Sequence, residues 1–255
     1  MNNNSEFTIR QEVPADFSIV ENLTREAFWN VYRPGCLEHY VLHCYRSRPE
    51  FIPELSLVVE RECEGSSGGE NGDAGSANRE GADGGEKCRE IVAHVMFSWS
   101  EILLDEDCPC ASAAENGSAP AKTSEANRRL KMMTFGPISV RPDLQRQGIG
   151  KMLLDYAMER AREMGGGCLA MCGNIRFYGK CGFEVATTKG VRYADDPDGD
   201  APYFLIRELT PRFLNGVRGT YKDPQGYFVS ETEAEEFDKQ FPPKEKKVLP
   251  GQLTH

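Results

Sequence analysis

Apolar residues in the first half of the chain follow two different periods, which predict a mixture of strands and helices. Segment 6–13 (EFTIRQEV) favours an opening strand, and segment 14–32 repeats apolar residues at helical spacing. A second helix is expected over 35–46. Two further apolar runs, ELSLVVERE at 54–62 and REIVAHVMFSWSEILL at 89–104, predict strands that pair as a hairpin with a long connection.

The second half of the chain alternates strands with helices. A strand is expected over 130–140, and Pro137 inside it predicts a bulge, because proline cannot donate to a β-ladder. Segment 149–164 places its apolar residues on one stripe of a long helix, which should end at Gly165. The remaining elements are a short buried strand at 167–173, a helical turn at 174–183 and a late strand at 201–209. This order predicts an α+β fold with a parallel strand pair flanking the long helix.

Two segments interrupt this pattern, and a distinct tail follows it. Segment 64–87 has no large apolar residue, and segment 105–128 is also polar, so neither can offset its ordering entropy by burial. In the tail, Ser230 followed by Glu233 is typical of a helix capping box. We therefore predict one domain over 7–209 with flexible insertions at 64–87 and 105–128. A C-terminal extension over 210–255 should hold a short helix and a loose end.

Composition argues against several classes of protein. The 255 residues carry a formal net charge of −10, whereas nucleic-acid-binding proteins usually present a basic face. No run approaches the roughly 18 consecutive apolar residues that a membrane span needs, and the N-terminus lacks a signal-peptide pattern. We therefore expect a cytoplasmic monomer or homodimer that binds neither nucleic acid nor membrane.

The cysteines predict neither a disulfide framework nor a metal site. Nine is an odd number, and the chain is long for a disulfide-stabilised scaffold. Cys108 and Cys110 are closely spaced, but their local candidates as co-ligands, His39 and His43, lack the glutamate of an HExxH motif because Tyr40 follows His39. We therefore predict no bound metal. Three other cysteines in apolar runs are expected to be small buried hydrophobic residues: Cys168, Cys172 and Cys181.

Two glycines, Gly148 and Gly150, stand where the long helix should begin, although each glycine costs a helix about 1 kcal/mol. A helix N-terminus presents unpaired N–H groups and a positive dipole end, so small residues there let a phosphate approach. A nucleoside-triphosphate loop would need a hydroxyl residue after Lys151, where Met152 stands. A dinucleotide fingerprint would need glycine where Leu153 stands. The glycines therefore favour a third type of anion site.

Two motifs carry a resemblance to a known family. QRQGIG at 145–150 matches a Gln/Arg-x-x-Gly-x-Gly/Ala motif, and FYGKCGF at 177–183 is similar to a Tyr-x-x-x-Gly-Phe segment. On these motifs, and over 7–209, the sequence resembles the GNAT superfamily of N-acetyltransferases, in particular predicted bacterial acetyltransferases of unassigned substrate. The resemblance implies a mostly antiparallel central sheet with a parallel, splayed strand pair and flanking helices.

The resemblance also implies acetyl-CoA as co-substrate. Backbone N–H groups at the start of the helix would hold the pyrophosphate. The strand that precedes them, splayed at the bulge, would pair with the amides of the pantetheine arm as an added strand does. Asn174 is a further expected contact to the arm. The cofactor-binding residues are then Ile138, Ser139, Val140, Gln145, Arg146, Gln147, Gly148, Ile149, Gly150, Lys151 and Asn174.

The same resemblance places Tyr178 beside the thioester sulfur. A phenol with a pKa of about 10 can protonate a leaving thiolate, so Tyr178 is the predicted general acid. The expected reaction is acetyl transfer to a primary amine, small-molecule or peptide, by direct attack in a ternary complex. The general base stays unassigned, because His94 fits a histidine at the core edge better than a base. The alternative is a catalytically inactive acyl-CoA sensor or an interaction module.

Overall fold

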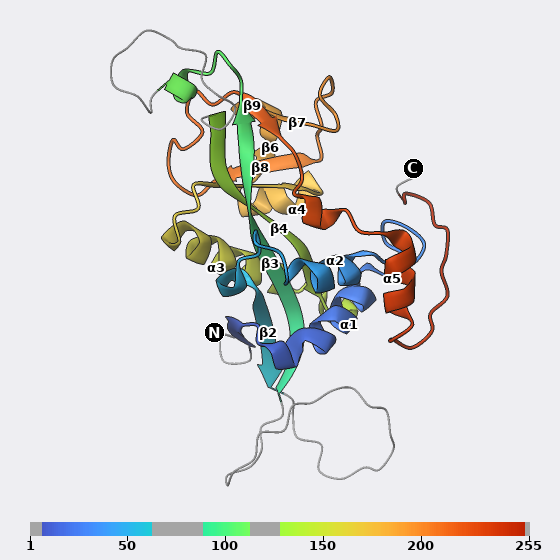
Figure 1. The fold of residues 1–255 in the computed structure, drawn as a ribbon. Helices are drawn as coiled ribbons and strands as arrows, with labels where there is room; N and C mark the ends of the chain where they lie inside the picture. The colour runs from blue at the N-terminus through green and yellow to red at the C-terminus, as the bar shows by residue number, and fades with distance from the viewer. Residues whose placement is uncertain (1–6, 63–88, 113–127, 253–255) are drawn as a thin grey trace, which may run out of the picture.

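A computed structural model describes residues 7–62, 89–112 and 128–252, and the strands of these residues form one sheet (Figure 1). The strands are β1 (Phe7–Gln11), β2 (Leu57–Glu62), β3 (Arg89–Leu104), β4 (Arg129–Val140), β5 (Cys168–Cys172), β6 (Glu184–Val185), β7 (Val191–Tyr193), β8 (Phe204–Glu208) and β9 (Gly219–Tyr221). The order across the sheet is β1-β2-β3-β4-β5-β8-β6, and β9 pairs with both β3 and β7. Within the described residues the pairs are antiparallel except β4–β5 and β7–β9. The predicted fold class, hairpin and parallel pair are confirmed, whereas the β7–β9 pair was not predicted.

The parallel pair β4–β5 is short because the two strands part. Their register contains only Met133 opposite Leu169 and Thr134 opposite Ala170. Beyond Thr134, β4 stays paired with β3 as far as Val140. The β3–β4 register shifts in this stretch, so that Gly136 and Pro137 together face a single residue of β3. The bulge predicted from Pro137 is therefore confirmed, and it lies where β4 leaves β5.

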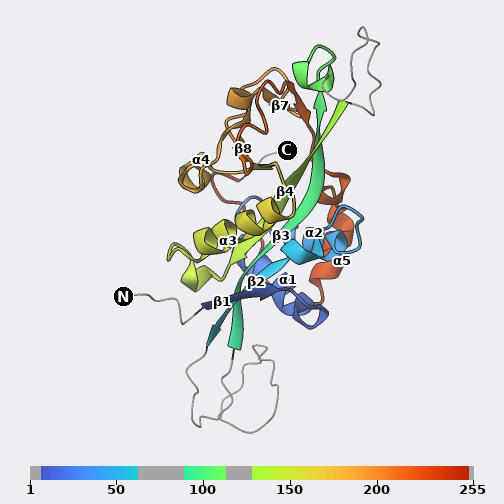
Figure 2. The same cartoon turned by 90° about the vertical axis from the view of Figure 1, so that its left-hand side faces the viewer.

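The helices are α1 (Phe17–Phe28), α2 (Glu38–Tyr45), α3 (Ile149–Glu163), α4 (Ile175–Tyr178) and α5 (Glu231–Asp238). α3 covers one face of the sheet, and α1, α2 and α5 lie on the other (Figure 2). Leu153 and Ala157, on the predicted apolar stripe of α3, are completely buried. On the other face, Val20 of α1 and Leu42 of α2 are buried in a separate cluster with Met96 of β3. Successive residues of a strand point to opposite faces, so one sheet supports both cores.

α1 is shorter than the helix predicted over 14–32. A 3₁₀ turn occupies Pro14–Asp16, and the α-helix ends at Phe28. Asn30 then has a φ of 61°, a left-handed conformation that asparagine tolerates better than most residues. Its Oδ1 accepts a hydrogen bond from the N–H of Gly35 at 2.9 Å. This local turn, which helical periodicity does not report, redirects the chain toward α2.

The segment after residue 209 takes part in the sheet and in the core. In β9, Tyr221 pairs with Ile102 of β3. α5 begins at the predicted cap, because the Ser230 hydroxyl accepts the N–H of Glu233 at 3.4 Å. The helix is held to α1 by a hydrogen bond of 2.5 Å from Arg25 Nε to Asp238 Oδ1. The C-terminal segment is thus packed on the elements that precede it.

The predicted insertion 64–87 lies outside the described residues, and so do residues 113–127 of the insertion predicted over 105–128. Of the latter, the described part contains a 3₁₀ turn at Pro109–Ser112. Among the described residues, no helix has both the length and the apolar character that crossing a membrane requires.

Candidate active site

The loop between β4 and α3 ends in a left-handed glycine. Gly148 is the N-cap of α3, with a φ of 92° and a ψ of −8°. A Cβ atom at this position would have nothing within 4 Å. The N–H groups of the first helical turn have no partner in the helix itself, because such bonds begin with that of Met152 to the Gly148 carbonyl at 2.9 Å. The loop therefore offers unpaired donors and open space at one point.

Two glutamine side chains of this loop donate hydrogen bonds to backbone carbonyls of the same segment. Gln145 Nε2 donates to the carbonyl of Val140 at 3.1 Å, and Gln147 Nε2 donates to the carbonyl of Asp143 at 3.0 Å. Arg146 has a φ of 63° and is exposed, as is Lys151. The two glutamines thus fix the loop, and the two cations give it a positive charge beside the positive end of the helix dipole. Lys151 also forms an ion pair with Asp155.

Gly150 marks a close approach of three elements. A Cβ atom there would lie 3.3 Å from Cγ2 of Val140 and 3.9 Å from Cζ of Phe177. The start of α3, the end of β4 and α4 therefore meet at Gly150. Ile149, next to it, is buried in the core beneath α3. The glycine motif and the Tyr178 motif, separate in the sequence, are adjacent in the fold.

The edge of β4 that faces β5 has no strand partner after Thr134 within the described chain. Ile138 and Val140 are half-buried along this stretch, while Ser139 is fully buried. The Ser139 hydroxyl donates to Thr24 Oγ1 of α1 at 2.9 Å, so its side chain serves the α1 packing. What the stretch offers to an extended ligand is therefore its backbone.

Tyr178 stands at the end of α4 in an aromatic surround. Its ring lies edge-on to Phe135, Phe177 and Phe183, with centroids 5.9, 4.8 and 5.8 Å away. Gly173 allows this position, because a Cβ there would lie 2.6 Å from Cε2 of Tyr178. Burial raises the pKa of Tyr178, with smaller contributions from other groups. The phenol therefore keeps its proton at neutral pH, as a general acid requires.

Asn174 has a structural partner. Its Oδ1 accepts the backbone N–H of Arg176 at 2.9 Å and so caps α4. This bond gives Asn174 a structural role, and its contact to the pantetheine arm stays a prediction.

His94 is confirmed as a core histidine. It is fully buried, and its Nε2 lies 3.1 Å from the hydroxyl of Ser56. Burial lowers its pKa to about 4, so the ring is neutral at pH 7.

The predicted burial of three cysteines is confirmed for two of them. Cys168 and Cys181 are buried, whereas Cys172 is exposed, because it lies at the end of β5, where that strand no longer pairs with β4. In the described residues no group of three or more His, Cys, Asp or Glu side chains is placed to hold a metal ion.

A polar cluster missed by the sequence analysis lies on the side of β4 and β5 away from α3. Tyr193 donates to Asp223 Oδ2 at 2.6 Å, and the Tyr227 hydroxyl donates to the carbonyl of Gly136, in the bulge, at 3.0 Å. Tyr221 belongs to the same group and is fully buried. We call these four residues, Tyr193, Tyr221, Asp223 and Tyr227, the Asp223 cluster. They come from β7, β9 and the chain after β9, and no local motif connects them.

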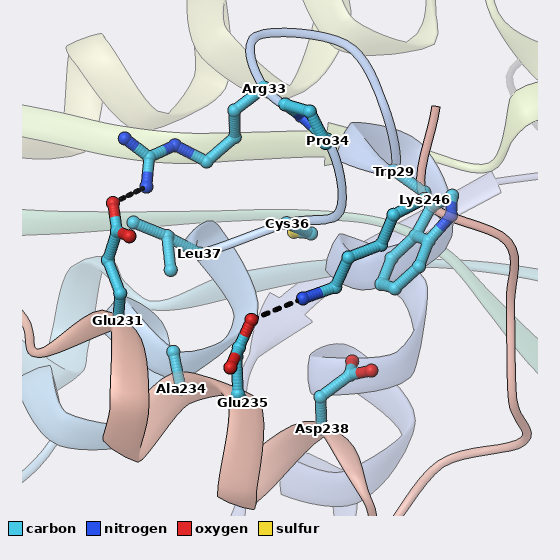
Figure 3. Close-up of a pocket in the computed structure, with 10 residues that line it drawn as sticks. All are labelled: Trp29, Arg33, Pro34, Cys36, Leu37, Glu231, Ala234, Glu235, Asp238 and Lys246. Atoms are coloured by element: carbon cyan, nitrogen blue, oxygen red, sulfur yellow. Dashed lines mark hydrogen bonds and ion pairs between the residues drawn. The ribbon is translucent and has the colours of Figure 1, made fainter. Parts of the chain in front are cut away.

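A small pocket lies elsewhere, between the α1–α2 connection and α5 (Figure 3). Its cavity volume is about 50 Å³, enough for a few water molecules. Arg33 and Lys246 face into it and pair with Glu231 and Glu235 at 2.5 and 2.6 Å. None of the predicted cofactor residues lines it. This pocket is too small for an acyl-CoA arm.

Comparison with known proteins agrees with this geometry. Residues 111–185 match the family model described as the acetyltransferase (GNAT) domain. No curated protein matches the chain. A solved GNAT family N-acetyltransferase (YhbS) from Escherichia coli, in complex with CoA, is 18% identical with a TM-score of 0.60, over 89% of this chain and 94% of that one. A GNAT family acetyltransferase from Brucella melitensis, in complex with acetyl-CoA, is 19% identical with a TM-score of 0.53, over 88% and 99%.

The matched segment and the fold agree on one class of protein. Residues 111–185 match the GNAT acetyltransferase domain, and the fold of the chain is that of solved GNAT N-acetyltransferases. The resemblance seen in the two sequence motifs is confirmed.

Proposed function

We propose that the protein transfers the acetyl group of acetyl-CoA to a primary amine by direct attack in a ternary complex. The observation that carries this proposal is the parting of β4 from β5 beside the glycine loop, with the Tyr178 ring packed against Phe135 next to the bulge. The two solved relatives, one bound to CoA and one to acetyl-CoA, support the choice of donor.

The loop fits the diphosphate of a coenzyme. The space beside Gly148 is open, and the first-turn N–H groups and the cations Arg146 and Lys151 surround it. Gln145 and Gln147 fix the loop, and Ile149 anchors it to the core. The free edge of β4 at 138–140 then suits an extended, amide-bearing arm. Asn174 stays a predicted contact to this arm.

The bound donor supplies a thioester whose C–S bond breaks as the N–C bond to the amine forms. Tyr178 donates its phenol proton to the leaving sulfur. Burial raises the pKa of the phenol, and it raises the basicity of a thiolate released beside it in the same way, so the apolar surroundings do not by themselves oppose the transfer. The aromatic neighbours of Tyr178 give its ring largely apolar surroundings for this step.

Tyr178→Phe tests the proposal, because it keeps the ring and removes the proton. We expect the dissociation constant of CoA, measured by calorimetry, to be unchanged. The turnover number for acetyl-CoA with a panel of primary amines should fall roughly ten- to a thousandfold, within or just below the usual range for a positioned acid.

Tyr156→Phe is the matched control, since Tyr156 is an exposed tyrosine of α3. It should leave both quantities unchanged. A Tyr178→Phe protein that turns over at the wild-type rate would remove Tyr178 from the mechanism. A wild-type protein that binds CoA but acetylates no amine would favour the alternative of an acyl-CoA sensor.

A further inference from the structure

The two faces of the sheet differ where β4 and β5 part. Phe135 and Met171 point into the core beneath α3, the side on which Tyr178 packs. Their neighbours along the strands, Thr134 and Cys172, therefore point to the opposite face. A donor held by the α3 loop and the edge of β4 would present its thioester in the gap. An acceptor is then free to approach from the opposite face.

The Asp223 cluster lies on that opposite face. Tyr227 reaches the carbonyl of Gly136, and the Tyr221 hydroxyl lies near Thr134, the last residue of β4 that pairs with β5. Cys172, at the end of β5, lies close to the cluster, because Asp223 adds to the rise that burial causes in the pKa of Cys172, and Cys172 adds to the rise in the pKa of Tyr193. The cluster thus borders both strands at the point where they separate.

One polar group in this cluster lacks a partner. The Tyr221 hydroxyl is buried, and within the described chain it has no hydrogen bond of normal distance and angle, although Thr134 and Asp223 are close enough to affect its pKa. A buried hydroxyl without a well-formed hydrogen bond destabilises the free protein, so a ligand that satisfies it would gain affinity.

The charge around the cluster is negative. No lysine or arginine among the described residues forms an ion pair with Asp223, whose Oδ2 already accepts the Tyr193 hydroxyl. Burial raises the pKa of Asp223, the Tyr193 and Tyr221 hydroxyls lower it in part, and Asp195, on the acidic loop after β7, raises it further. A half-buried carboxylate with an acidic neighbour attracts a cation.

We propose that the Asp223 cluster is the acceptor site and that the acceptor is an aliphatic primary amine, which enters as its ammonium ion. This inference rests on the proposed acetyl transfer. Asp223 and the unpartnered Tyr221 hydroxyl contact the amino group, while Tyr193 and Tyr227 hold the carboxylate and the bulge in place.

Two groups on opposite faces of the sheet handle the protons of the reaction: Asp223 on the acceptor side and Tyr178 on the side of α3. The ammonium ion gives one proton to the Asp223 carboxylate, and the neutral amine attacks the thioester carbonyl. The N–C bond forms, the C–S bond breaks, and Tyr178 protonates the sulfur. The second proton of the nitrogen restores the Tyr178 phenol, and Asp223 releases its proton to solvent. The net products are the amide, CoA thiol and one proton.

The test is the binding of butylammonium chloride to the CoA-saturated protein, measured by calorimetry, which needs no turnover. Asp223→Asn should weaken this binding at least tenfold and leave the dissociation constant of CoA unchanged. Asp198→Asn, a change of the same charge on the exposed acidic loop, should alter it less than twofold. Of these two variants, only Asp223→Asn should lose turnover with butylamine, by at least a hundredfold.

Tyr221→Phe provides a second, independent variant. Removing an unpartnered hydroxyl should not lower the melting temperature, but it should weaken butylammonium binding several-fold. A folded Asp223→Asn protein that binds butylammonium as tightly as the wild type overturns the inference. If Asp223→Asn does not fold, unchanged binding by Tyr221→Phe overturns it instead. Loss of butylamine acetylation in Tyr178→Phe with butylammonium binding intact would separate the acceptor site from the chemistry.

Discussion

Replacing Gly148 by alanine separates the conformational role of this glycine from its proposed role in binding. Gly148 has a φ of 92°, and a Cβ there would meet nothing within 4 Å. The added methyl group thus causes no clash within the protein. The left-handed conformation costs an L-residue about 1–2 kcal/mol. We expect the free energy of unfolding to fall by that amount.

The expected effect on CoA affinity has a different origin. The backbone strain is present in the free and the bound protein, so it cancels in the dissociation constant. The methyl group, however, would occupy the open space beside the first-turn N–H groups, where the pyrophosphate is proposed to lie. We expect at least a tenfold weaker dissociation constant for CoA, which corresponds to about 1.4 kcal/mol.

Gly165→Ala is the matched control. Gly165 follows the other end of α3 with a φ of 86°, and a Cβ there would also have nothing within 4 Å. Chemical denaturation should show a similar loss of stability in both variants, and calorimetric titration with CoA should show weaker binding only for Gly148→Ala. Equal CoA affinities in the two variants would refute the pyrophosphate assignment. An unchanged stability of Gly148→Ala would refute the left-handed conformation.

Two further predictions concern stability. His94 has a pKa of about 4 in the folded protein and about 6.5 when unfolded. As the pH falls, the unfolded chain therefore takes up a proton on His94 at a higher pH than the folded protein does. The free energy of unfolding should therefore drop by up to about 3 kcal/mol as the pH falls from 6.5 to 4. Urea denaturation of His94→Asn should lack most of this drop, and an equal pH dependence would contradict the argument. Phe237→Ala should cost about 3 kcal/mol, because Phe237 is 7% exposed and packs against His39 and His43. Phe228→Ala, at a residue 51% exposed, should shift the urea midpoint little, and equal shifts would show that α5 is not docked.

Most of the longer elements, and the site features that depend on near neighbours, could be predicted from the sequence. The apolar stripe of α3, its stop at Gly165 and its glycine entry follow from spacings of a few residues. Pro137 predicted the bulge because the lost donor is a property of that residue alone. The Ser230 cap is likewise a contact between residues three apart. Local geometry decides each of these features, so the order of residues is enough to predict them.

The contacts between residues far apart in the sequence could not be predicted in this way. The Asp223 cluster joins Gly136 of β4 to residues of β7 and β9 and to Tyr227, and β9 is too short to show an alternating pattern. The burial of Cys172 was predicted wrongly. The apolar run that contains it continues beyond Ala170, where β5 stops pairing with β4, so Cys172 is exposed. The helix cap made by Asn174 was not predicted, since that bond depends on the backbone angle before α4, and its contact to the pantetheine arm stays a prediction. Periodicity reports which face of an element is apolar, but the contact between two faces is fixed by the packing of the whole chain.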